Sequence, residues 1–224
     1  MSYDGLLLDF DGVVVDVLED EKRLPAVREK ITTRSTADDI ELDTAVVEAL
    51  AGSITPDRLR TVSEKLDIPA EQLWQYRDDA FLELFETAAR NDGKNLYPDV
   101  TALEDLTVPL GIASNNQTRI VEVLVAEYEL AGHFETIHAR EPTPESLGNK
   151  KPEPIFLERA MADLAVENPL YVGDKETDII AGQRVDIDTA LIRRAHNADR
   201  TIETEPTYEV TSLDEIVALV EQSG

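Results

Sequence analysis

The sequence contains no cysteine and has little positive charge. The absence of cysteine excludes disulfides, thiolate metal sites and cysteine nucleophiles. Only 21 Lys and Arg oppose 47 Asp and Glu among 224 residues, so the formal net charge is −26. Such a charge repels nucleic acids and anionic membranes, and we expect neither as a partner. The acidic residues are spread along the whole chain, which favours a halophilic protein whose self-repulsion is screened in a high-salt cytoplasm.

Long hydrophobic runs are lacking as well. No apolar segment of the sequence approaches membrane-spanning length, and the first apolar strand begins by Leu6, so we expect no signal peptide. Apolar residues nevertheless make up 42% of the chain, which is enough for a buried core in a protein of this size. We therefore expect a soluble, cytoplasmic protein, either a monomer or a homodimer.

Short apolar runs alternate with amphipathic helix patterns through most of the chain. The apolar runs predict strands over residues 6–8, 109–113, 136–139, 170–172 and 189–192. The helical spacing of apolar residues predicts helices over residues 117–130, 153–164, 177–184 and 213–221. This alternation predicts an α/β fold with a doubly wound parallel sheet and right-handed crossovers.

Residues 17–92 interrupt this alternation, because they contain helix patterns and little that is typical of a strand. Thr55-Pro56 has the capping hydroxyl and the early proline of a helix start. An apolar stripe at helical spacing then runs from Leu73 to Ala88. We therefore predict an inserted α-helical domain over residues 17–92 and an α/β core built from residues 1–16 and 93–224.

Asp9 and Asp11 directly follow the first predicted strand. Positions two apart at the end of a strand point to the same side, so both carboxylates would project beyond the carboxyl edge of the sheet. Ligands of open α/β sheets bind at that edge. Like charges at such a short distance need a cation or a shared proton. The alternative is a solvated turn, because Asp-Gly is a common turn pair.

Asp174 and Asp178 follow another apolar strand in the same way. If a helix begins there, the two carboxylates lie close together on its first turn. Helix capping is the alternative explanation, since acids are favourable near a helix N-terminus. Oxygen ligands without cysteine or paired histidine favour Mg²⁺ over zinc or copper. The three histidines have no metal-ligand spacing and are interpreted as structural or surface residues: His133, His138 and His196.

Ser114 and Lys151 could bind an anion at the same edge. Ser114 ends a predicted strand and offers a hydroxyl donor, and from Asn115 onward the chain would open a helix whose free amides favour anions. A plain helix N-cap is the alternative for Ser114. Lys151 stands before a proline-rich approach to the next helix, and its neighbour Lys150 is a rival for the same role. Both lysines suit an anionic substrate in a chain of such negative charge.

Four segments, in this order, resemble the motifs of the haloacid dehalogenase superfamily of aspartyl-nucleophile hydrolases: residues 6–12, 111–115, 151–154 and 171–178. The helical insert is similar to the small cap of the phosphoglycolate-phosphatase and sugar-phosphatase branch. Residues 97–100 resemble the return to the core in that branch, with Asp99 where glycine is more usual. The resemblance implies a Rossmann-like core and a Mg²⁺-dependent phosphatase acting on a small phosphorylated metabolite, such as phosphoglycolate or a sugar phosphate.

The same resemblance implies the roles of the site residues. Asp9 would attack phosphorus and form an aspartyl-phosphate, and Asp11 would protonate the leaving oxygen and then help to activate water. The implied Mg²⁺ ligands are Asp9, the main-chain carbonyl of Asp11, and Asp174, with Asp178 in support. The implied phosphate-binding residues are Ser114, Asn115 and Lys151.

Other functions are compatible with parts of this pattern. A sugar phosphomutase of the same superfamily shares every core motif, whereas Asp11 argues against a dehalogenase. A receiver-like signalling domain would need a phospho-accepting aspartate after a middle strand, where this chain has Ala139-Arg140-Glu141. A non-catalytic protein that binds a phosphate ligand on the same fold is a further alternative.

Overall fold

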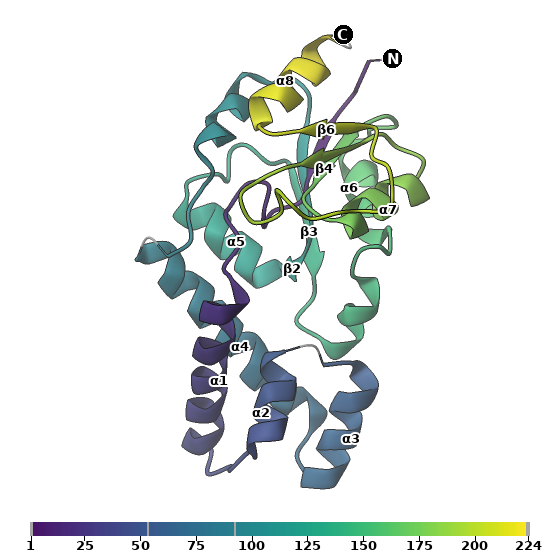
Figure 1. The fold of residues 1–224 in the computed structure, drawn as a ribbon. Helices are drawn as coiled ribbons and strands as arrows, with labels where there is room; N and C mark the ends of the chain where they lie inside the picture. Colours follow the sequence, from purple (N-terminus) through teal and green to yellow (C-terminus); the bar gives the residue numbers. More distant parts are fainter. Residues whose placement is uncertain (1, 53, 92, 223–224) are drawn as a thin grey trace. The chain divides into compact units, whose positions relative to one another are not determined.

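The computed structural model of the chain describes residues 2–52, 54–91 and 93–222 (Figure 1). Internal contacts divide the chain into an α/β unit and a helical unit. The α/β unit comprises Met1–Val17, Asn95–Arg140 and Asn149–Gly224, and the helical unit comprises Leu18–Lys94 and Glu141–Gly148. This division differs from the predicted one mainly at Glu141–Gly148. Residue 92, at the predicted end of the insert, lies outside the described residues.

The α/β unit contains a six-stranded, wholly parallel sheet. Its strands are β1 (Leu6–Leu8), β2 (Leu110–Gln117), β3 (Thr136–Arg140), β4 (Leu170–Gly173), β5 (Thr189–Ile192) and β6 (Tyr208–Val210), in the order β3-β2-β1-β4-β5-β6. The predicted doubly wound parallel sheet is confirmed. Strand β6 was not predicted, because its three residues, Tyr208-Glu209-Val210, do not form a continuous apolar run.

Strand β2 is longer than predicted. It continues to Gln117, and its pairing with β3 shifts register between Ala113 and Gln117. Ala113 pairs with His138 and Gln117 with Arg140, so β2 bulges over the intervening residues. The prediction that Ser114 ends the strand was wrong, because polar side chains hid the backbone pairing. The following helix begins at Thr118, one residue after the predicted start at 117, so Asn115 lies on the strand and does not open a helix.

Helices cover both faces of the sheet. They are α5 (Thr118–Glu127), α6 (Ile155–Leu164), α7 (Glu176–Arg184) and α8 (Leu213–Gln222), with 3₁₀ segments η1 (Pro98–Asp105) and η2 (Pro144–Asn149). Phe156 and Leu157 of α6 and Ala181 of α7 share one buried cluster with Leu7 and Tyr171 of the sheet. Figure 1 shows α5 on the opposite side of the sheet. Strand β1 is fully buried because it is covered on both faces.

The helical unit contains α1 (Asp20–Ala37), α2 (Thr44–Ala51), α3 (Pro56–Leu66) and α4 (Ala70–Arg90). Helix α3 starts at Pro56, as predicted from the Thr55-Pro56 pair. The Thr55 hydroxyl accepts the backbone N–H of Arg58 at 3.3 Å. The other three helices pack on α4 through the predicted apolar stripe. Among the described helices, none is both long and apolar enough to cross a membrane.

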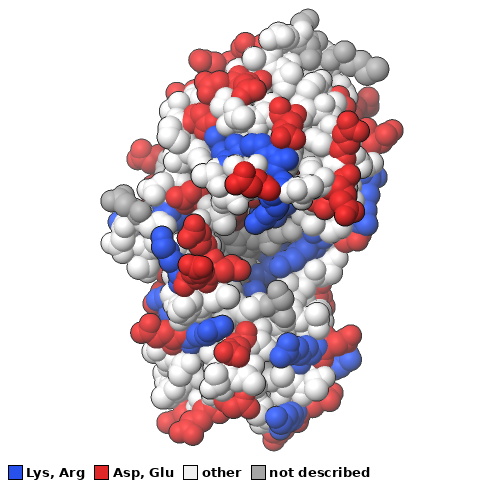
Figure 2. All heavy atoms as spheres, viewed as in Figure 1, with Lys and Arg blue, Asp and Glu red and all other residues white. Residues whose placement is uncertain are grey.

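Acidic side chains occupy much of the surface shown in Figure 2. They are spread over the α/β unit and the helical unit alike, with Lys and Arg between them. On this face the negative charge is therefore spread over both units and is not confined to one segment. The response of stability to salt stays a prediction.

Candidate active site

The strand order delivers two aspartates to one point. Strand β1 lies between β2 and β4, and the winding direction of the sheet reverses there. Crevices at such reversals, beyond the carboxyl ends of the strands, are the usual ligand sites of open α/β sheets. Asp9 directly follows β1 and Asp174 directly follows β4, and the backbone N–H of Asp9 donates to the Val172 carbonyl at 2.8 Å. The two carboxylates thus meet at this edge.

Asp9, Asp174 and Asp178 form a buried acidic triad. One carboxylate oxygen from each lies within 4.8 Å of the others, and the residues are only 4%, 1% and 1% exposed. Gly12 leaves room beside the triad, because a Cβ on it would lie 2.4 Å from Asp174 Oδ2 and its φ is +90°. A close, buried set of oxygen ligands fits a hard divalent cation. Asp11 is not a member of this triad.

Asp178 has two structural roles at once. Its Oδ2 accepts the backbone N–H groups of Asp174 at 3.2 Å and Lys175 at 3.0 Å, which caps the start of α7. Its Oδ1 lies 2.7 Å from Lys151 Nζ. The capping explanation is therefore correct, and it coexists with a place in the triad. Through these bonds Asp178 holds the loop that carries Asp174.

Lys151 is the buried cation of the site. Its Nζ lies 3.1 Å from Asp9 Oδ1 and 2.7 Å from Asp178 Oδ1. It also donates to the Ala113 carbonyl at 3.0 Å and the Tyr171 hydroxyl at 2.7 Å. An ammonium has only three N–H donors, so these four oxygens must share them. Burial alone lowers the pKa of Lys151, but attraction to Asp178 and Asp9 outweighs it and raises the pKa overall.

The nucleophile candidate Asp9 is poorly solvated. Burial raises the pKa of its carboxyl group, and repulsion by Asp178 adds to this effect. Attraction to Lys151 lowers the pKa and partly offsets the burial. A divalent cation at the triad would favour the ionised form further, because it adds positive charge beside the carboxylate.

The bulge in β2 directs polar side chains into the site. Ser114 is buried, and its Oγ accepts the backbone N–H of Asn116 at 3.2 Å. Asn115 accepts the backbone N–H of Lys151 at 2.7 Å through Oδ1, so its side chain holds the segment that carries this lysine. Asn116 Nδ2 donates to Asp11 Oδ2 at 2.8 Å. Asn116 was not among the predicted site residues, although it lies in the polar run that follows Ala113.

Three further residues contact Asp174. Lys175 Nζ lies 2.9 Å from Oδ1, His196 Nε2 lies 2.8 Å from Oδ2, and Asn197 Nδ2 donates to the main-chain carbonyl at 2.8 Å. His196 was interpreted as a structural or surface residue, and the structure places its partly buried ring against Asp174 of the triad. No local pattern could have shown this, because 22 positions separate it from Asp174.

Sequence comparisons find phosphoglycolate phosphatases among the proteins similar to this chain. The curated phosphoglycolate phosphatase of Photorhabdus laumondii is 29% identical over 189 residues, which cover 80% of this chain and 73% of that protein. The phosphoglycolate phosphatase of Escherichia coli K12 is 25% identical over 67% of this chain, and the match spans only 61% of its own length. Several matched relatives are thus covered over less than two thirds of their length.

Solved structures share the fold. The crystal structure of β-phosphoglucomutase from Clostridium difficile matches with a TM-score of 0.62 and 16% identity, over 99% of this chain and 96% of that one. At this identity the similarity concerns the fold alone. The family model described as haloacid dehalogenase-like hydrolase matches residues 6–192, which include all four motif segments. The chain belongs to the haloacid dehalogenase-like hydrolase family.

Proposed function

We propose that this protein is a Mg²⁺-dependent phosphatase that hydrolyses a small phosphate monoester through an aspartyl-phosphate on Asp9. The observation that carries the proposal is the buried contact of Asp9 with Lys151, at 3.1 Å, beside two further carboxylates. The phosphoglycolate phosphatases among the relatives support a phosphate monoester as the substrate.

The metal would be held by the carboxylates of Asp9 and Asp174 and by the main-chain carbonyl of Asp11, with Asp178 in support. When bound, Mg²⁺ supplies positive charge that brings an anionic nucleophile and an anionic phosphate together. The buried, oxygen-only triad fits this role. Lys175 also pairs with Asp174, and because its side chain is partly exposed it can move into solvent when a cation binds.

The reaction has two displacements at phosphorus. An oxygen of Asp9 attacks the phosphorus atom, the bond to the ester oxygen breaks, and Asp11 gives that oxygen its proton. Asp11 then accepts a proton from water, whose oxygen attacks the aspartyl-phosphate and regenerates Asp9. The hydrogen bond from Asn116 holds the Asp11 carboxylate in place for both proton transfers.

Lys151 and Ser114 would bind the phosphoryl oxygens. Lys151 has more oxygen neighbours than N–H donors, so a phosphoryl oxygen can replace one neighbour without leaving a buried donor unpaired. The Ser114 oxygen accepts a backbone N–H, and its own O–H can donate to phosphate. Asn115 contributes by fixing the Lys151 backbone. These donors stabilise the charge of the transferring group.

We assign the helical unit the role of a cap that carries substrate specificity, which follows from the family resemblance. Phosphoglycolate or a sugar phosphate is the proposed class of substrate. A phosphomutase is the second candidate, because β-phosphoglucomutase shares the fold. It would return the phosphoryl group from Asp9 to a sugar instead of to water. The cytoplasmic, high-salt setting and the monomeric or homodimeric state stay predictions.

Phosphate release from a panel of small phosphate monoesters tests the proposal. The assay is run with Mg²⁺ in multimolar KCl, with Asp9→Asn as the inactive variant and Asp163→Asn as the matched control at an exposed aspartate. We expect turnover of one compound class that Asp9→Asn loses and Asp163→Asn keeps. Conversion of a hexose 1-phosphate to its 6-phosphate without release would support the mutase. Full activity of Asp9→Asn would contradict the nucleophile assignment.

A further inference from the structure

The loop after β5 reaches back to the acidic triad. Its residue His196 places Nε2 2.8 Å from Asp174 Oδ2, and Asn197 Nδ2 donates both to the Asp174 carbonyl at 2.8 Å and to the Ile192 carbonyl at 3.0 Å. We propose that His196 is a positioning residue, which orients the Asp174 carboxylate for a divalent cation. This inference rests on the metal site of the proposed function.

The hydrogen bonds around His196 define its role as a donor. The Tyr97 hydroxyl lies 3.3 Å from His196 Nδ1. Burial raises the pKa of Tyr97 to about 12, although Arg194 opposes the shift, so the phenol keeps its proton at neutral pH. Tyr97 can therefore donate to Nδ1, which leaves the ring proton on Nε2 and directs it at Asp174. Tyr97 and His196 form a short chain of hydrogen bonds that ends on the carboxylate.

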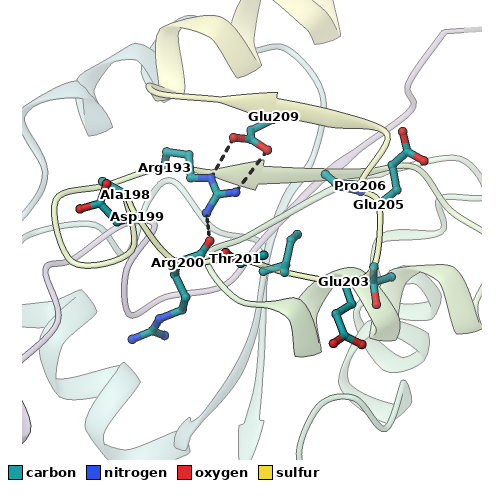
Figure 3. Close-up of a pocket in the computed structure, with 11 residues that line it drawn as sticks. Arg193, Ala198, Asp199, Arg200, Thr201, Glu203, Glu205, Pro206 and Glu209 are labelled. Atoms are coloured by element: carbon teal, nitrogen blue, oxygen red, sulfur yellow. Dashed lines mark hydrogen bonds and ion pairs between the residues drawn. The ribbon is translucent and has the colours of Figure 1, made fainter.

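A first arginine braces the loop that carries His196. Arg193 pairs with Glu209 of β6 at 2.9 and 3.3 Å, and its Nη1 donates to the carbonyls of Asn197 at 3.2 Å and Arg200 at 2.7 Å. Figure 3 shows Arg193 between Glu209 and the Arg200 backbone, at one side of a hollow of about 470 Å³. Since these donors bind Glu209 of β6 and the backbone of the loop, we interpret Arg193 as a residue that holds the loop against the sheet and not as part of a ligand site.

A second arginine fixes the other side of the loop. Arg194 pairs with Asp99 at 2.7 and 3.0 Å, and its guanidinium carbon lies 4.1 Å from the centre of the Tyr97 ring. Its Nη2 also donates to the Val13 carbonyl at 3.2 Å, in the loop that follows Asp11. The unusual acid Asp99 thus anchors the residue that stacks on Tyr97. Two ion pairs outside the triad thus keep this region in place. Arg193–Glu209 holds the loop of His196, and Arg194–Asp99 holds the guanidinium that stacks on Tyr97.

Asp174 needs such a partner because its other oxygen faces a competing cation. Lys175 Nζ lies 2.9 Å from Oδ1, and the lysine side chain is 42% exposed, so it can move. The bond to His196 keeps the carboxylate plane fixed whether Lys175 is present or displaced. Partners that hold a ligating carboxylate commonly contribute about 10- to 100-fold to metal affinity. His196 acts on the metal only through Asp174, which makes it a positioning residue.

Binding of Mn²⁺ in the absence of any phosphate ester tests the inference without relying on activity. Free Mn²⁺ is measured by electron paramagnetic resonance in about 2 M KCl, where a screening length below about 3 Å suppresses binding to surface acids. The variants are His196→Ala, His196→Gln, Asp174→Asn and His138→Ala. His138 is the matched control, because its Nε2 also lies 2.8 Å from a carboxylate, that of the exposed Asp163.

We expect His196→Ala to raise the Mn²⁺ dissociation constant about 10- to 100-fold. His196→Gln, which retains a side-chain N–H donor, should recover most of the affinity, and His138→Ala should bind like the wild type. Weak binding by both His196 variants would show that packing and not donation matters, which overturns the inference. It is also overturned if His196→Ala keeps wild-type affinity while Asp174→Asn loses it. Equal binding by wild type and Asp174→Asn would instead refute the metal site itself.

Discussion

The α/β unit and the helical unit use ion pairs in different surroundings. At the sheet edge, Lys151 is fully buried and pairs with Asp9 and Asp178, which are equally inaccessible. In the helical unit, Glu83 pairs with Lys30 at 2.5 Å and Arg34 at 2.7 Å, but its side chain is 45% exposed. The distances are alike, whereas the access of water differs.

The access of water determines how much each ion pair contributes to the stability of the fold. An exposed pair gains little because solvent and salt screen it, whereas a buried charge that loses its partner keeps the full cost of desolvation. Removing the cation that the buried carboxylates share should therefore cost much more stability than removing one partner of the more accessible ion pairs around Glu83. Four substitutions test this contrast, from the largest expected effect to the smallest.

Lys151→Met should have the largest effect. It removes the cation and leaves Asp9 and Asp178 buried without it, so we expect the free energy of unfolding to fall by about 3–5 kcal/mol. Phosphate release should be lost as well. Urea unfolding at neutral pH with a chelator measures the first effect, with Lys30→Met as the matched control. A loss no greater than that of Lys30→Met would contradict the contrast.

Tyr171→Phe should have a smaller effect, because Lys151 keeps three oxygen partners. We expect a loss of about 0.5–1.5 kcal/mol in the free energy of unfolding. The ammonium also loses an orienting contact, so kcat should fall by about tenfold, less than the loss of a direct donor to the reacting group. Tyr3→Phe is the control, since Tyr3 is buried and donates to Asp188 at 2.7 Å. Equal kcat in both variants would exclude a role of the Tyr171 hydroxyl.

Asp9→Asn should stabilise the metal-free protein modestly at neutral pH. Because burial raises the pKa of Asp9, the folded state favours its protonated form, and wild-type stability is lost as the pH rises through that pKa. At about pH 4 or below, near the unfolded pKa, wild type and variant should unfold at similar temperatures, and the gap should widen as the pH rises. Added Mg²⁺ should reduce this difference in unfolding temperature, because it favours the ionised carboxylate of the wild type. A difference in melting temperature between wild type and variant that is the same at every pH would contradict a raised pKa of Asp9.

Glu83→Gln should have the smallest effect, a loss below about 1 kcal/mol in the free energy of unfolding. The hydrogen bond from Lys30 lowers the pKa of Glu83, and Arg34 lowers it further, but water reaches this partly buried pair. The loss should vanish in multimolar KCl, whereas that of Lys151→Met should persist, because salt screens exposed pairs more than buried ones.

Wild-type stability should itself rise with KCl at a net charge of −26. Greater stability in dilute buffer would contradict adaptation to high salt.

Local patterns were sufficient for the strands that carry the aspartates. Leu6–Leu8 and Leu170–Gly173 are continuous apolar runs, and such runs predict buried parallel strands. Once the strands were predicted, the meeting of Asp9 and Asp174 followed, since parallel strands end at one edge of a sheet. Local patterns failed at β2, where Ser114 and Asn116 are polar although the strand continues through them.

The sequence by itself determined the fold class, the order of the motifs and the side chains available for chemistry. It did so because apolar periodicity and strand-end acids are local properties that neighbouring residues reveal. Only the tertiary structure decided which groups meet: Asn116 with Asp11, Tyr171 with Lys151, and His196 with Asp174. These contacts join segments that are distant along the chain, and they depend on the bulge in β2 and on a braced loop after β5. Such contacts are set by packing and charge pairing in three dimensions, which no short stretch of sequence encodes.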